Sequence, residues 1–140
     1  MRTVIAIAAL ALAARCAPVT ASASLNRTPE DAAACATSAL QSLGYAVIDA
    51  NVADGVRAER DLHPANPFTG AADADRITVW FRNGEQPQIR VLGETVHTPG
   101  VWRGPLGRRG FVSAPALPMR TIPSRSVRGD VETIATSCSS

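Results

Sequence analysis

Few residues in this chain of 140 have side chains suited to acid–base chemistry. His97 with Asp49 and Glu59 is the set that a small hydrolase could use, because imidazole and carboxylate groups exchange protons near neutral pH. Neither His97 nor His63 has partners at metal-ligand spacing, and no nucleophile motif or phosphate-binding loop is present. We predict no metal and no cofactor. A small periplasmic hydrolase or ligand-binding enzyme is the alternative to a non-catalytic binding or structural domain.

A second chemistry, the binding of anions, is indicated by residues 97–125, a segment rich in Arg, Pro and Gly without an acidic residue. It contains Trp102, Arg103, Arg108 and Arg109. Guanidinium groups pair with phosphate and aromatic rings stack on bases, as single-stranded nucleic acid requires. The N-terminal residues 1–14 have the pattern of an export signal. An exported protein meets lipid headgroups, cell-wall polymers and acidic glycans first, so we predict an anionic envelope component and no nucleic acid. The alternative is a solvated loop whose guanidinium groups pair with nearby carboxylates.

Export is predicted by the N-terminus of the chain. A single positive charge, Arg2, precedes an apolar run over residues 3–14. A helix of this length is too short to span a bilayer, which takes roughly 20 residues, and the pattern is typical of a secretory signal. We expect the protein in the bacterial periplasm or at the outer membrane, in contact with a membrane only through a lipid anchor.

Two processing schemes fit the end of this signal. A small-residue stretch, Ala-Ser-Ala, suits a signal peptidase cut before Ser24, which makes residues 1–23 the export signal. The alternative is a lipoprotein signal over residues 1–15, in which Cys16 is acylated. Arg15 departs from that pattern, because such signals place a small residue directly before the cysteine.

The number of cysteines bears on both schemes. The chain has three, and an odd number in an exported protein needs an explanation. Cys16 is acylated in one scheme and discarded in the other, which leaves Cys35 and Cys138. We predict a disulfide between these two in an oxidising compartment. The alternative is two independent buried thiols that pack as small hydrophobic groups.

Two helices are predicted to carry these cysteines. The first covers residues 29–43, between a Thr28 N-cap and a Gly44 stop. The last lies within residues 124–138, with Ser126 as its N-cap. Apolar residues recur at three- and four-residue steps in both, so each cysteine falls on a buried face. If the helices pack antiparallel on one sheet, the start of the first meets the end of the last.

Four strands are predicted between the helices, as two hairpins. Residues 45–50 and 56–61 flank a glycine turn, and residues 76–82 and 88–96 flank Asn83-Gly84. The order α-β-β-β-β-α predicts an α+β two-layer sandwich, with a four-stranded antiparallel sheet and both helices on one face.

The second hairpin has two faces of different character. Side-chain alternation turns its branched apolar residues toward the helices. The other face carries Trp80 and Leu92, which form a candidate exposed patch because a large exposed aromatic can mark an interface. The alternative is that the long loop at 97–125 half-covers Trp80.

Charge and composition indicate one small domain, residues 24–140. The formal net charge of +2 comes from Arg2 and Arg15, so the rest of the chain is neutral and the folded part is not a basic protein. The stretches CATSALQSLGY, GVRAERD and DVETIATSC resemble those of small, uncharacterised bacterial envelope lipoproteins. This resemblance implies an envelope location with a binding or structural role, and it assigns no activity.

Overall fold

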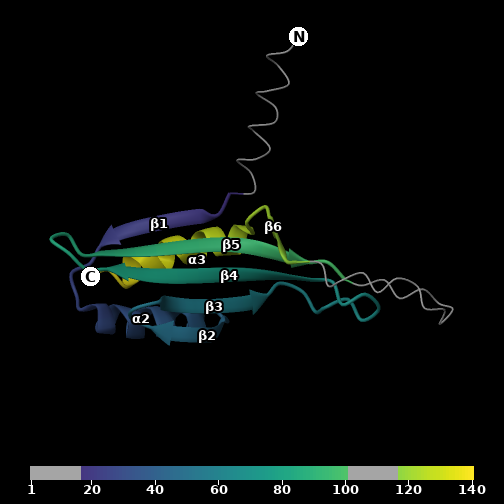
Figure 1. Cartoon of the computed structure of the whole chain (residues 1–140), viewed down its shortest axis with the longest axis horizontal. Helices are drawn as coiled ribbons and strands as arrows, with labels where there is room; N and C mark the ends of the chain where they lie inside the picture. The colour runs from purple at the N-terminus through teal and green to yellow at the C-terminus, as the bar shows by residue number, and fades with distance from the viewer. Residues whose placement is uncertain (1–16, 101–116) are drawn as a thin grey trace, which may run out of the picture.

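The structure, a computed structural model, describes residues 17–100 and 117–140. It is an α+β fold in which two helices pack against an antiparallel sheet (Figure 1). In chain order the elements are β1 (Val19–Ser24), α2 (Pro29–Ser42), β2 (Ala46–Asn51), β3 (Gly55–Asp61), β4 (Ala72–Arg82), β5 (Gln88–Thr98), β6 (Met119–Thr121) and α3 (Arg125–Ser137). The predicted α+β class is confirmed.

The predicted number of four strands is wrong, because the described part of the chain forms a sheet of six. The strand order is β1-β5-β4-β3-β2, and every pair is antiparallel. The two additional strands share one edge of β5: β1 pairs with its residues 88–93 and β6 with its residues 95–97. The element order is therefore β-α-β-β-β-β-β-α rather than α-β-β-β-β-α.

The two additional strands lack the sequence pattern that marks a strand. β1 has the sequence VTASAS, without a large apolar side chain, and β6 has only three residues in a proline-rich segment. Both pair with an edge of β5 whose N–H and C=O groups would otherwise lack partners in the sheet. Tertiary pairing, more than local propensity, therefore makes these segments strands.

Local signals fix the helix ends. Thr28 caps α2, since its hydroxyl accepts a hydrogen bond at 3.1 Å from the N–H three residues later, and Gly44 follows with a φ of +83°. The predicted cap of α3, Ser126, is wrong. Ser124 takes that role and accepts a hydrogen bond at 3.1 Å, while the hydroxyl of Ser126 lies in the first turn and reaches the carboxylate of Asp75.

The core lies between the helices and one face of the sheet. The predicted inward face of the second hairpin is confirmed, because its branched side chains are fully buried and Phe81 is partly buried. Gly93 of β5 allows α3 to lie close to the sheet, since a Cβ atom there would be 2.5 Å from Cγ2 of Val131. The largest fully buried apolar side chains are Leu40, Ile77, Ile89, Ile134, Val56, Val79, Val91, Val127 and Val131.

The connections are shorter than the sequence pattern predicts. β4 begins at Ala72, four residues before the predicted start, so it takes up part of the loop that follows β3. The predicted loop at 97–125 contains the end of β5 and the whole of β6. Residues 101–116 of that loop lie outside the described residues.

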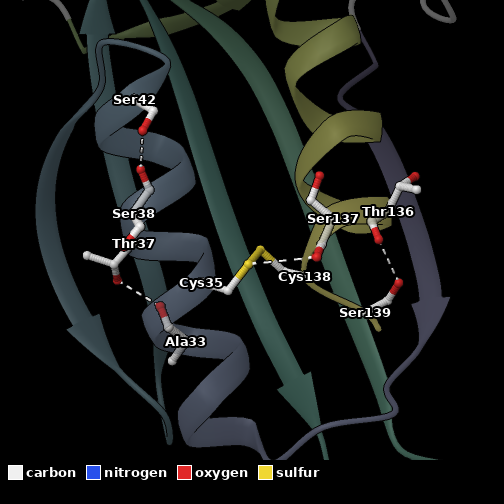
Figure 2. Close-up of a disulfide and its surroundings, with 9 residues drawn as sticks. All are labelled: Ala33, Cys35, Thr37, Ser38, Ser42, Thr136, Ser137, Cys138 and Ser139. Atoms are coloured by element: carbon white, nitrogen blue, oxygen red, sulfur yellow. Dashed lines mark hydrogen bonds between the residues drawn. A yellow bond between two sulfur atoms is a disulfide. The ribbon is translucent and has the colours of Figure 1, made fainter.

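The predicted disulfide is present. Cys35 of α2 is bonded to Cys138, the C-cap of α3, and their Cα atoms are 5.6 Å apart. Figure 2 shows the bond joining the two helices, with Cys35 projecting from α2 toward the end of α3. The bridge spans 103 residues of sequence, so it holds the first helix to the last turn of the chain.

Candidate functional site

The face of the sheet opposite to the helices, the open face, carries a row of alternating charges. We call Glu59, Arg76, Glu94 and Arg120 the ion-pair ladder; they come from β3, β4, β5 and β6 in that order. Arg76 lies 2.6 Å from Glu59 and 3.7 Å from Glu94, and Arg120 lies 2.5 Å from Glu94. Each charge has an opposite charge beside it, so this half of the open face is close to neutral.

A groove occupies the other half of the open face, beside β1. Its volume is about 570 Å³. We call it the open-face groove, and it is lined by Thr20, Ser22, Trp80, Phe81, Arg82, Gln88, Arg90 and Leu92. The pairing register explains its shape, because the short side chains of β1 stand beside longer ones on β5, and β4 follows on the other side of β5.

The central row of this groove is Ser22, Arg90 and Trp80, which are direct neighbours across β1, β5 and β4. The indole of Trp80 is 39% exposed. On its far side stands Gly55 of β3, where a Cβ atom would lie 3.2 Å from Cδ1 of Trp80. The missing side chain at Gly55, which has a φ of +93°, therefore leaves room for the ring on the sheet surface.

The structure brings together the two residues of the predicted exposed patch. Leu92 pairs with Thr78, one row from Trp80, and both patch residues line the groove. Leu92 is half-buried and Trp80 is more exposed. Arg82 and Arg90 lie beside them on the same face of the sheet. The predicted patch did not include these two positive charges.

The residues of the predicted hydrolase site lie apart. Asp49 is ion-paired with Arg57 at 3.2 Å, and Glu59 belongs to the ion-pair ladder. His97 contacts Asp73 at 2.7 Å, and side-chain alternation places it on the opposite face from Glu59. The strand register puts Asp49 about 20 Å from His97. These three side chains cannot act on one substrate group in this arrangement.

A buried polar cluster at the start of α3 was not predicted. The carboxylate of Asp75 is fully buried and accepts hydrogen bonds from Arg60, Thr95, Ser124 and Ser126 at 2.7 to 3.2 Å. Both carboxylate oxygens are thus occupied within the protein. The cluster holds β3, β4 and β5 to the start of α3, and we assign it a structural role.

The cluster continues through Arg60 to the side of the helices. Arg60 also donates to Asp130 of α3 at 2.8 Å, and its guanidinium lies 4.2 Å from the ring centre of Tyr45. The Tyr45 hydroxyl donates to the same Asp130 carboxylate at 2.8 Å. Burial and this hydrogen bond raise the pKa of the Tyr45 phenol far above its usual range, so the phenol stays neutral in the folded protein.

Comparison of the chain with protein-family models, with curated proteins and with solved structures gives no match. The function must therefore be argued from the residues themselves.

Several predicted site residues lie outside the described residues. They are Cys16, Trp102, Arg103, Arg108 and Arg109. Within residues 17–100 and 117–140, no group of three or more His, Cys, Asp or Glu side chains is placed to hold a metal ion. The helices of the same two ranges lack the length and apolar character needed to cross a membrane.

Proposed function

We propose that this protein is an exported, non-catalytic binding or structural domain of the bacterial envelope, attached to a membrane through an acylated Cys16. The disulfide supports an exported location, since such bonds form and persist in oxidising compartments such as the periplasm. The anchor and the binding role rest on separate observations.

The position of β1 is the observation that carries the anchor. A signal peptidase cut before Ser24 would remove five of the six residues of β1 (Val19–Ser24). It would also leave residues 88–93 of β5 without their partner strand, an exposed edge of the kind that invites pairing between chains. Three β1 side chains that pack against the core, Val19, Ala21 and Ala23, would be lost with it.

A cut before Cys16 avoids these losses. Cys16 stands three residues before Val19, so lipoprotein processing leaves the whole of β1 in the mature protein. An extended chain covers at most about 3.6 Å per residue, which puts the acyl anchor within roughly 11 Å of the first residue of β1. The sheet edge made by β1 and β6 would then lie close to the membrane.

A non-catalytic role is supported by the separation of His97, Asp49 and Glu59, each of which is paired with a different residue. A binding role is supported by the open-face groove, which combines an exposed indole with two guanidinium groups. The prediction that Trp102, Arg103, Arg108 and Arg109 contact an anionic envelope component stays part of this proposal. It is tested by salt-dependent binding to anionic vesicles, which should weaken when the three arginines are replaced by Ala.

Intact mass spectrometry of the exported protein tests the anchor. We expect an N-terminus at Cys16 that carries diacylglycerol, and a mature chain that includes β1. Two reciprocal variants sharpen the result. Cys16→Ser should abolish acylation, whereas Ala23→Val, which puts a larger residue at the alternative cut site, should leave processing unchanged. The proposal would be overturned by a mature N-terminus at Ser24, if cleavage there is blocked by Ala23→Val and is unaffected by Cys16→Ser.

A further inference from the structure

We propose that the open-face groove binds an acidic saccharide, with the sugar ring stacked on Trp80 and its carboxylate held by Arg82 and Arg90. This inference names a ligand class for the binding role proposed above, and it does not depend on the acylation of Cys16.

The charge of the groove is the first reason. Of the nine arginines in residues 17–100 and 117–140, four form ion pairs with carboxylates: Arg57, Arg60, Arg76 and Arg120. Arg82 and Arg90 are both exposed, and neither has a carboxylate within 4.0 Å among those residues. The lining of the groove includes no Asp or Glu. The groove therefore presents two guanidinium groups whose charge is available to a ligand carboxylate, which they can bind with paired N–H donors.

The second reason is that Trp80 is a neighbour of both cations on the open face. Trp80 pairs with Arg90 across β4 and β5, and Arg82 is two residues along β4 on the same face. A sugar ring presents a face of weakly positive C–H groups, which is attracted to the negative face of an indole. A ring seated on Trp80 would hold a carboxylate within reach of both guanidinium groups.

The shape and the remaining polar groups favour a saccharide over a membrane surface. The groove is a hollow of about 570 Å³ among side chains on the sheet, within the range of small-ligand sites, and a flat bilayer cannot fill such a hollow. Its other polar side chains are the hydroxyls of Thr20 and Ser22 and the amide of Gln88. These groups both donate and accept hydrogen bonds, as a ligand covered with hydroxyls requires.

The test is titration of the purified exported protein with a galacturonate trisaccharide, and with its methyl ester as the neutral control. Detergent micelles keep an acylated form in solution. We expect saturable binding of the acid that weakens as salt increases, and little binding of the ester. Arg82→Gln and Arg90→Gln should each weaken binding by at least about tenfold, since hydrogen bonds to charged groups are lost. The matched control Arg57→Gln removes the same charge from the same face outside the groove and should change nothing.

Tryptophan fluorescence reports on the ring itself. The chain has two tryptophans, Trp80 and Trp102, and we expect the acid to change the emission of the parent protein but not that of Trp80→Leu. Thermal unfolding of this variant checks that it is folded. The proposal is overturned by equal binding of acid and ester, or by a binding signal that survives the groove substitutions. Binding lost on replacing Arg103, Arg108 and Arg109 but not Arg82 and Arg90 overturns it too, as does binding to anionic phospholipid vesicles alone.

Discussion

Asp75 of β4 and Ser124, the N-cap of α3, are joined by a hydrogen bond of 2.7 Å from the serine hydroxyl to a fully buried carboxylate. Ser124 Oγ also accepts the first N–H bond of the helix. One side chain thereby joins the start of α3 to the centre of the sheet. The buried carboxylate, its guanidinium partner and the helix cap depend on each other.

Removing this carboxylate should be costly. Asp75→Ala removes one of the two carboxylate partners of Arg60 and the buried acceptor of three hydroxyl groups, and we expect a loss of about 3 to 5 kcal/mol in the free energy of unfolding. The exposed pair of Asp49 and Arg57 is the matched control, because Asp49→Ala should cost no more than about 1 kcal/mol. Urea unfolding measures both. Equal losses in the two variants would show that burial of Asp75 does not matter.

The disulfide should stabilise the fold through the length of chain it closes. A bond across 103 residues restricts the unfolded chain, and its loss should cost about 4 to 5 kcal/mol. Urea unfolding of the protein with and without reductant measures this, and Cys35→Ser with Cys138→Ser should match the reduced protein. An unfolding midpoint that reductant leaves unchanged would contradict the prediction.

The stability should fall at high pH because of Tyr45. Burial and the Asp130 hydrogen bond raise the pKa of this phenol in the folded protein, whereas the unfolded phenol ionises near pH 10. Its contribution is complete below about pH 10, and above that the free energy of unfolding should drop by up to about 1.4 kcal/mol per pH unit. Tyr45→Phe should remove this decline.

The same residue gives a direct optical test, because Tyr45 is the only tyrosine in the chain. Phenolate absorbance should appear only as the protein unfolds in alkali. Phenolate formation near pH 10 in protein that is still folded would show that the phenol is accessible.

Two glycines should respond to alanine in opposite directions. At Gly93 a Cβ atom would lie 2.5 Å from Cγ2 of Val131 and 2.8 Å from Cγ2 of Val127, so Gly93→Ala should destabilise the protein by about 1 to 3 kcal/mol. At Gly129 of α3, apart from the adjoining residues and the backbone of its own helix, no atom of the described residues lies within 4 Å of such a Cβ, so Gly129→Ala should stabilise by up to about 1 kcal/mol. Thermal unfolding of the two variants measures the contrast, and shifts of the same sign would argue against close packing at Gly93.

The parts of the fold that depend on local sequence could be predicted. Thr28 and Gly44 bound α2 because capping and a left-handed stop are properties of a few neighbouring residues. The disulfide followed from the cysteine count together with the helix faces. β1 and β6 could not be found in this way, because their pairing with β5 depends on residues about 70 and 25 positions away in the chain.

The polar cluster was missed although a signal for it exists. Asp75 has the same alternation parity as Ile77 and Val79, so extending that strand backward turns Asp75 toward the core. Predicting its partners requires the packing of α3, which the sequence pattern does not supply. In the groove, Trp80 and Leu92 were found by alternation, whereas the hollow beside them depends on the unpredicted strand β1.

The contacts that close this domain join segments that are far apart in the chain. β1 pairs with β5, and Cys35 is bonded to Cys138. The N–H of Asn26 donates to the carbonyl of Ser139 at 2.7 Å. Contacts so distant in sequence form slowly and only after most of the chain is available. A chain with this topology cannot complete its fold while its C-terminal residues are still being made. We expect the chain to remain unfolded during synthesis. Passage through a membrane channel requires an unfolded chain.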